Sequence, residues 1–129
     1  MVQVTQPFVH HCLPIRDRNG HKGTFGKVHI LAGSVGFTGA PALASEAAVR
    51  TGSGLVSLSV PQEIWPVLAV KCQEAMPSPV PPYPELLEKM NQSDSVLIGP
   101  GLGEAGPRTC APAIWWRRSP LRWSWMQTA

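Results

Sequence analysis

The stretch that most constrains the fold runs from His21 to Val60, where two apolar segments enclose an alanine-rich one. Val28–Ala32 is an apolar run typical of a buried strand, and Leu55–Val60 is a second such run. Between them, apolar residues recur at helical spacing on one face: Ala40, Leu43, Ala44, Ala47 and Ala48. The order strand, helix, strand predicts a βαβ unit, and therefore an α/β fold with a parallel sheet.

The turn between the first strand and the helix is spaced by Gly33, Gly36 and Gly39. Glycines let a ligand approach the backbone closely, and the free N–H groups at the start of a helix favour an anionic or polar ligand. Thr38 is predicted to cap the helix, and Pro41 suits its first turn. We therefore expect a ligand-accessible turn at the carboxyl end of the first strand.

Three common glycine motifs are excluded. The spacing of the turn is not G-x-G-x-x-G, and the chain contains no G-x-x-x-x-G-K-[ST]. Gly23–Val28 imitates part of a protein-kinase glycine-rich loop, but neither the lysine strand nor the catalytic-loop pattern of a kinase follows.

Residues 62–103 predict two short helices, a third strand and a second glycine loop on the same edge of the sheet. Gln62–Lys71 reads as a short helix with Pro66 in its first turn, and the five prolines between Glu74 and Pro84 predict an extended connector without regular structure. Glu85–Met90 predicts one or two helical turns. Ser95–Ile98 then predicts a third parallel strand, which runs into Gly99-Pro100-Gly101-Leu102-Gly103. Two glycine loops at the carboxyl ends of parallel strands form a cleft where α/β sheets bind ligands.

The first 19 residues are a mixed segment without a sustained period, and we expect them to form a surface lead-in. His10-His11-Cys12 suggests a metal site, but adjacent side chains point in different directions and no matching ligand cluster follows, so no metal site is predicted. His29, inside the first strand, is interpreted as structural rather than catalytic.

Composition fits one soluble domain and excludes several classes of protein. The 129 residues are 43% hydrophobic and 15% charged, which suffices for a core. The net charge of +3 owes much to arginines near the C-terminus, so nucleic-acid binding is not predicted. The chain has no 18-residue apolar run and no signal-like N-terminus, and its three cysteines are widely spaced. We therefore expect no membrane span, reduced thiols and a cytoplasmic location.

Several motifs in register resemble the NAD(P)H-hydrate dehydratase family. They are His21-Lys22-Gly23-Thr24-Phe25-Gly26, Ala32-Gly33-Ser34, Gly36-Phe37-Thr38-Gly39-Ala40, Arg50-Thr51-Gly52-Ser53-Gly54-Leu55-Val56 and Ile98-Gly99-Pro100-Gly101-Leu102-Gly103. The resemblance covers roughly Leu13 to Gly103. It implies a ribokinase-like fold and an enzyme that uses ADP, or in some members ATP, to dehydrate the hydrated form of NADH or NADPH.

The resemblance also implies roles for individual residues. Ala40 and Gly101 would contact the hydrated dinucleotide, largely through backbone groups. Gly39, Gly99 and Gly103 would support the two loops. A possible site wall would comprise His21, Lys22, Gly33 and Ser34. The nucleotide would phosphorylate the substrate's hydroxyl with the help of Mg²⁺, and phosphate elimination would restore the ring double bond. A homo-oligomer, if the domain is complete, and functional pairing with an NAD(P)H-hydrate epimerase are further implications.

The resemblance divides the chain into a lead-in (1–20), a partial ribokinase-like domain (21–106) and a tail (107–129). Catalytic residues are not assigned, because the family's phosphate loop and catalytic aspartate lie farther along. The sheet would correspond to the N-terminal half of the fold, with an unpaired edge and exposed apolar surface. We expect poor solubility and no catalytic turnover of the polypeptide.

The tail holds four of the five tryptophans and four arginines. One interpretation is a membrane-surface or partner-binding segment. The other is a frameshift between Gly103 and Ile114. Because tryptophan and methionine each have one codon, reading residues 122–128 in a shifted frame gives an apolar triplet followed by Asp-Ala-Asp, as in the family's next strand.

Two other function classes stay open. A small-molecule kinase of the same superfold, acting on a thiazole- or pyridoxal-like alcohol, would share the glycine loops. A non-catalytic interaction protein would use the tail as its contact.

Overall fold

The computed structural model describes residues 3–13, 15–103 and 124–125, and its centre is a parallel sheet. The strands are β1 (Lys27–Leu31), β2 (Leu55–Val60), β3 (Met76–Pro79), β4 (Ser95–Ile98) and β5 (Ser124–Trp125), in the order β3-β2-β1-β4-β5. Every neighbouring pair is parallel. The predicted α/β class with βαβ units is therefore confirmed.

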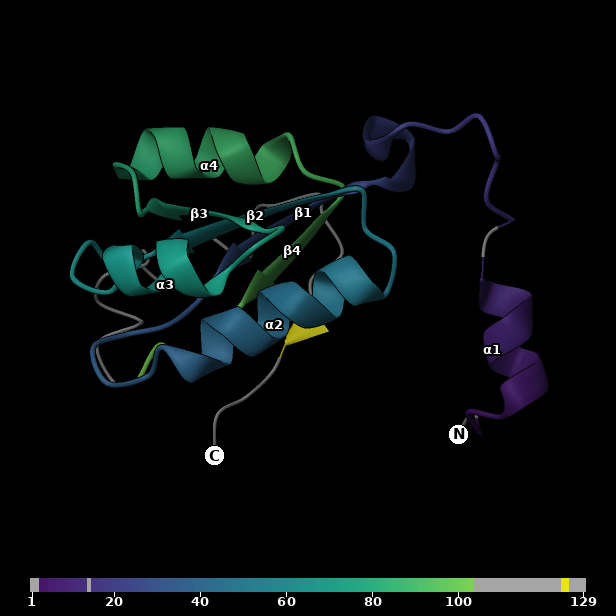
Figure 1. Ribbon diagram of the computed structural model, residues 1–129, viewed down its shortest axis with the longest axis horizontal. Helices are drawn as coiled ribbons and strands as arrows, with labels where there is room; N and C mark the ends of the chain where they lie inside the picture. Colours follow the sequence, from purple (N-terminus) through teal and green to yellow (C-terminus); the bar gives the residue numbers. More distant parts are fainter. Residues whose placement is uncertain (1–2, 14, 104–123, 126–129) are drawn as a thin grey trace.

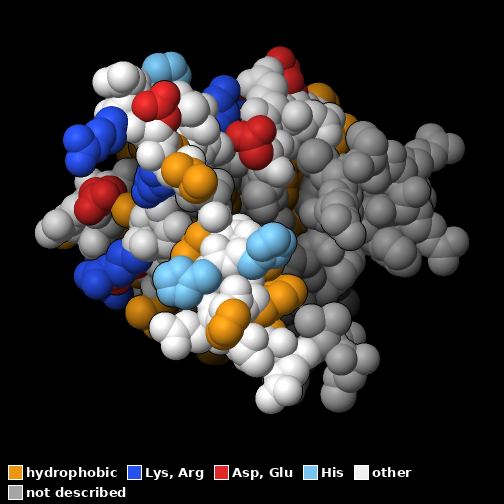
Figure 2. Space-filling view, turned by 90° about the vertical axis from the view of Figure 1, so that its right-hand side faces the viewer, with side chains coloured by type: hydrophobic (Ala, Val, Ile, Leu, Met, Phe, Trp, Pro, Cys, Tyr) orange, Lys and Arg blue, Asp and Glu red, His pale blue; other side chains and the backbone are white. Residues whose placement is uncertain are grey.

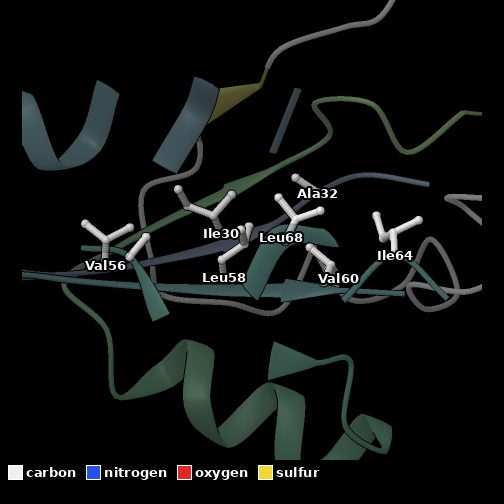
Figure 3. Packing of buried hydrophobic residues seen from close by; sticks show 8 residues of the cluster. Ile30, Ala32, Val56, Leu58, Val60, Ile64 and Leu68 are labelled. Carbon is white, nitrogen blue, oxygen red and sulfur yellow. The ribbon is translucent and has the colours of Figure 1, made fainter. Parts of the chain in front are cut away.

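Helices cover both faces of the sheet, as Figure 1 shows. Helices α2 (Gly39–Arg50) and α3 (Trp65–Lys71) lie on one face, and α4 (Tyr83–Asn91) lies on the other. Because side chains alternate along a strand, neighbouring residues of β1 pack into two different hydrophobic clusters, one on each face of the sheet. Ile30 packs with Leu58 and Leu68 between the sheet and α2 and α3 (Figure 3). Leu31 packs with residues of α4 and β4: Leu86, Met90 and Val96.

The connector between Glu74 and Pro84 is a correction to the sequence prediction, because it contains strand β3. Val80 N–H donates to the Val60 carbonyl across 2.9 Å, so by alternation the N–H groups of Met76 and Ser78 also face β2. Pro77 and Pro79, which lack an N–H, then occupy the outward positions. Prolines are tolerated there because β3 is an edge strand, and they block pairing with a further strand.

Two helices also differ from the predictions. Helix α4 begins at Tyr83, earlier than predicted, because Pro84 is accommodated in the first turn, where no N–H is needed. The lead-in contains α1 (Gln6–Cys12), which begins where the Thr5 hydroxyl accepts a hydrogen bond from Phe8 N–H at 3.4 Å.

Helix α1 lies apart from the sheet, and all of its residues are exposed. Figure 2 faces this side of the molecule, where histidine and hydrophobic side chains gather. In the described part of the chain, no three His, Cys, Asp or Glu side chains are placed to hold a metal ion. Among the same residues, no helix is long and apolar enough to cross a membrane.

His29 is the buried polar residue of β1, with 2% of its surface exposed. Its Nδ1 lies 2.9 Å from Ser57 Oγ, and its Nε2 lies 3.1 Å from Ser59 Oγ. Burial, and secondarily the charge of Lys89 on α4, lowers the pKa of His29 from 6.5 to about 4. A neutral imidazole held between two serines fits the structural role expected from the sequence.

This depressed pKa predicts a pH-dependent loss of stability. Between pH 6.5 and 4 the unfolded chain binds a proton that the folded chain excludes, so His29 lowers the free energy of unfolding by about 3 kcal/mol as pH falls through this window. Above pH 6.5 His29 is neutral in both states, so it does not make the free energy of unfolding depend on pH. Urea denaturation from pH 4.5 to 7.5 should show this slope, and H29Q should remove it. H10Q, at an exposed position on α1, should retain it; an equal slope in H29Q would contradict the assignment.

Candidate functional site

The candidate site lies where the strand order reverses. From β1 the chain moves outward through β2 to β3, and then crosses the α4 face to place β4 on the other side of β1. Leu31 pairs with Ile98, so β1 and β4 end side by side at the same edge. The segments that follow these strands lie at the reversal of strand order, which is where open parallel sheets bind ligands.

Hydrogen bonds join the two loops directly. We call residues 32–38 the first loop and residues 99–103 the second loop. Gly33 N–H donates to the Pro100 carbonyl across 2.8 Å, and Gly99 N–H donates to the Leu31 carbonyl across 3.2 Å. The Ser34 hydroxyl donates to the Gly101 carbonyl across 2.8 Å. The loops therefore form one continuous surface.

Gly33 and Gly101 are required by their backbone conformation and by close packing. Gly33 has φ +84°, and a Cβ there would lie 2.8 Å from Pro41 Cγ and 2.9 Å from Ile64 Cδ1. Gly101 has φ +69°, and a Cβ there would lie 2.9 Å from Ala40 Cβ. The two residues that the resemblance assigns to substrate contact, Ala40 and Gly101, thus lie against each other although they are distant in sequence.

The start of α2 is open to a ligand. Thr38 occupies the N-cap position, but its backbone is helical and its side chain makes no capping hydrogen bond, which corrects the predicted cap. Its hydroxyl instead accepts a hydrogen bond from Lys71 Nζ across 3.2 Å. Among the described residues, no atom would lie within 4 Å of a Cβ at Gly36 or Gly39, so the backbone at these two glycines is uncrowded. Free N–H groups at the start of a helix favour an anionic or polar group.

The two loops have groups that can bind a ligand but none that can act as an acid or a base. Neither 32–38 nor 99–103 contains an ionisable side chain. What the loops offer is backbone groups and the positive end of α2, with the Lys71 ammonium nearby, whereas the Ser34 hydroxyl already donates to the Gly101 carbonyl. Such a surface can hold and orient a polar or anionic ligand.

The remaining predicted wall residues lie elsewhere. His21 and Lys22 belong to the start of a 3-10 helix (Lys22–Phe25) that precedes β1, and His21 Nδ1 accepts a hydrogen bond from Gly23 N–H across 3.1 Å. They are therefore at the amino edge of the sheet, separated from the loops by the length of a five-residue strand, about 16 Å. Gly33 and Ser34, by contrast, are part of the first loop.

A pocket of about 290 Å³ lies beside the middle of α2 and the end of α3, and neither loop contributes a residue to its described lining. Its lining includes Ser45, Glu46, Lys71 and Cys72. The Ser45 hydroxyl donates to the Ala42 carbonyl across 3.0 Å, and the Glu46 carboxylate pairs with Arg50 across 2.7 Å, so these groups already have partners. The loop surface is the stronger candidate because its donors at the start of α2 lack side-chain caps.

Two features of the site were missed by sequence reasoning: the Ser34–Gly101 hydrogen bond and the contact of Lys71 with Thr38. Neither has a local signal, because the partners are far apart in sequence. Ser34 is recognisable only as the hydroxyl residue that follows Gly33 in the first loop.

Comparison with known proteins gives consistent matches. A sequence profile described as NAD(P)H-hydrate dehydratase matches residues 28–120. The chain is 38% identical to a bifunctional NAD(P)H-hydrate repair enzyme, Nnr, of Moorella thermoacetica, over 79% of this chain and 23% of that enzyme.

Two solved structures are also similar. A ribokinase-like superfamily protein of Enterococcus faecalis matches with a TM-score of 0.69 and 28% identity, over 78% of this chain and 35% of that one. The ADP/ATP-dependent NAD(P)H-hydrate dehydratase of Bacillus subtilis, co-crystallised with ATP and Mg²⁺, matches with a TM-score of 0.62 and 31% identity, over 76% and 36%. The fold is thus the N-terminal part of a ribokinase-like fold, and the chain spans between 23% and 36% of the length of these three proteins.

The packing at Gly101 predicts a graded effect of alanine substitution. G36A introduces a Cβ at φ +88° in open space and should cost about 1 kcal/mol of unfolding free energy. G101A also places a Cβ at positive φ, and that Cβ would lie too close to Ala40 and 3.2 Å from the Phe37 carbonyl oxygen. Its loss of unfolding free energy should therefore exceed that of G36A by about 1–3 kcal/mol, the usual cost of overpacking. Urea denaturation measures both. Equal losses would show that the second loop does not pack against α2.

Proposed function

The chain belongs to the NAD(P)H-hydrate dehydratase family, and we propose that its two glycine loops form the substrate side of a site for hydrated NADH or NADPH. In the proposed reaction, a nucleotide-dependent dehydration restores the reduced dinucleotide. The residues proposed to contact the substrate are Ala40 and Gly101, supported by Gly33, Ser34, Gly39, Gly99 and Gly103. His21 and Lys22 are left out of this set because they lie at the opposite edge of the sheet.

The observation that carries the proposal is the contact between the two loops at the reversal of strand order. A dinucleotide is an extended anionic ligand, and a surface of glycine backbone with uncapped helix N–H groups can approach its polar groups closely. The absence of ionisable side chains from both loops limits their role to binding and orientation.

The proposed co-substrate is ADP or ATP, with Mg²⁺. The Bacillus subtilis relative was co-crystallised with ATP and Mg²⁺, which supports this choice. When bound, the nucleotide would supply the phosphoryl group and the ion would offset phosphate charge. Within residues 3–13, 15–103 and 124–125 no cluster of metal-ligating side chains occurs, so the proposal assigns Mg²⁺ no ligand there.

The proposal includes a functional partnership. A relative of the chain is described as a bifunctional NAD(P)H-hydrate repair enzyme, and we therefore propose that the chain acts together with an epimerase of NAD(P)H hydrate. A homo-oligomer, if the domain is complete, and a cytoplasmic location are part of the same proposal. The Trp/Arg-rich residues 107–123 and 126–129 lie outside the described part of the chain.

The proposal predicts binding without turnover for the 129-residue polypeptide. Isothermal titration should detect binding of NADPH hydrate, because the loops supply the substrate side. With ADP or ATP and Mg²⁺ added, absorbance at 340 nm should not recover, because no described residue at the loops is an acid or base. G101V, which fills the contact with Ala40, should lose binding, whereas K89Q on α4, across the sheet from α2, should retain it.

Other results would separate the alternatives. No binding of NADPH hydrate, or equal binding by G101V, would contradict the assigned site. Recovery of absorbance at 340 nm would contradict the binding-only role. Phosphorylation of a thiazole- or pyridoxal-like alcohol by ATP would identify a small-molecule kinase of the same superfold instead.

A further inference from the structure

Phe37, in the first loop, presents a large apolar side chain to solvent beside the contact of the two loops. The residue is 59% exposed, and it belongs to neither of the hydrophobic clusters formed by the described residues. An aromatic ring left in water gains free energy when a ligand covers it. The ring of Phe37 is therefore available for contact with a ligand rather than used in the core.

The backbone of Phe37 is held on two sides. Its N–H donates to the Ser34 carbonyl across 2.9 Å, which closes a turn in which Gly36 has φ +88°. Its carbonyl oxygen lies against the second loop, since a Cβ built at Gly101 would be 3.2 Å from it. The exposed surface of Phe37 therefore belongs mainly to the ring, and an aromatic side chain on a fixed backbone has only two torsions to order on binding.

Phe37 also flanks the residues proposed to contact the substrate. A Cβ at Gly101 would lie 2.9 Å from Ala40 Cβ and 3.3 Å from Phe37 Cβ, so both side chains lie against Gly101. The next residue, Thr38, accepts a hydrogen bond from Lys71 Nζ across 3.2 Å, which brings an ammonium group to the same part of the first loop. An exposed aromatic ring near glycine backbone and a cation suits a nucleotide, which carries both a base and phosphate.

We propose that Phe37 is a substrate-contacting residue whose ring stacks on a ring of the hydrated dinucleotide. This inference rests on the proposed function and deepens it, because it adds a side-chain contact to a site otherwise built from backbone groups. The dinucleotide has two rings whose faces a phenyl ring can cover, the adenine base and the hydrated nicotinamide ring, and a mononucleotide without adenine distinguishes them.

The test measures the dissociation constant of NADPH hydrate for the 129-residue chain and its variants by isothermal titration. F37A keeps the Cβ that packs on Gly101 but removes the ring, and should weaken binding roughly ten- to a hundredfold, the effect of one lost stacking contact. F37Y retains the ring and should keep most of the affinity. F37L, which is apolar but has no aromatic face, should bind almost as weakly as F37A.

F8A is the matched control, because Phe8 is another exposed phenylalanine, at 42%, but lies on α1, apart from the sheet (Figure 1). F8A should leave the affinity for NADPH hydrate unchanged. The midpoint of urea denaturation should be the same for F37A as for the unsubstituted chain, because the ring that F37A removes lies in solvent. This measurement separates a lost contact with the ligand from a lost fold.

The hydrate of reduced nicotinamide mononucleotide, which lacks adenine, identifies the stacked ring. F37A weakens binding of both ligands if the ring is that of the nicotinamide, and of NADPH hydrate alone if it is adenine. If the unsubstituted chain does not bind NADPH hydrate, the proposed function fails. If it binds and F37A or F37L binds equally well, or if F8A weakens binding as much as F37A, the role of Phe37 is refuted while the proposed function stands.

Discussion

The pairing of β1 with β4 is the interaction on which the candidate site depends. The two strands are parallel neighbours, yet between them the chain forms β2 and β3 on one side of β1 and then crosses to the other. This reversal sends α2 to one face and α4 to the other, and it brings the segments after Leu31 and Ile98 together at the same edge of the sheet. The glycines of both loops then allow the backbones to meet, and Ala40 can pack against Gly101.

The same pairing explains how the short sheet is stabilised. Alternate residues of β1 face different helices, so Ile30 and Leu31 anchor two separate cores. His29 is the one polar side chain among these buried residues of β1, and its ring nitrogens are hydrogen-bonded to Ser57 and Ser59. These two serines interrupt the otherwise apolar strand β2 on the face toward α4, and they thereby accommodate the imidazole. Removing the imidazole from water is tolerated because it stays neutral, which makes stability depend on pH.

The sequence predicts the elements with local patterns well, and contacts between distant residues poorly. Apolar runs and helical spacing located β1, α2, β2, α3 and β4 within a few residues, and glycine spacing located both loops. Strand β3 was missed because its prolines argue against a strand, whereas an edge position tolerates them. Thr38 occupies the N-cap position as predicted, but its hydroxyl makes no capping hydrogen bond and accepts from Lys71 instead. The Ser34–Gly101 bond depends on the register of β1 with β4, which no local pattern encodes.

The central claim is that two loops distant in sequence bind one ligand as a single surface. Its most direct test is a titration of the ¹⁵N-labelled chain with NADPH hydrate, followed by the amide resonances of Ala40 in α2 and Gly101 in the second loop. The account predicts that both resonances shift along the same binding curve, with one dissociation constant. Shifts confined to one of the two residues, or two different dissociation constants, would contradict it.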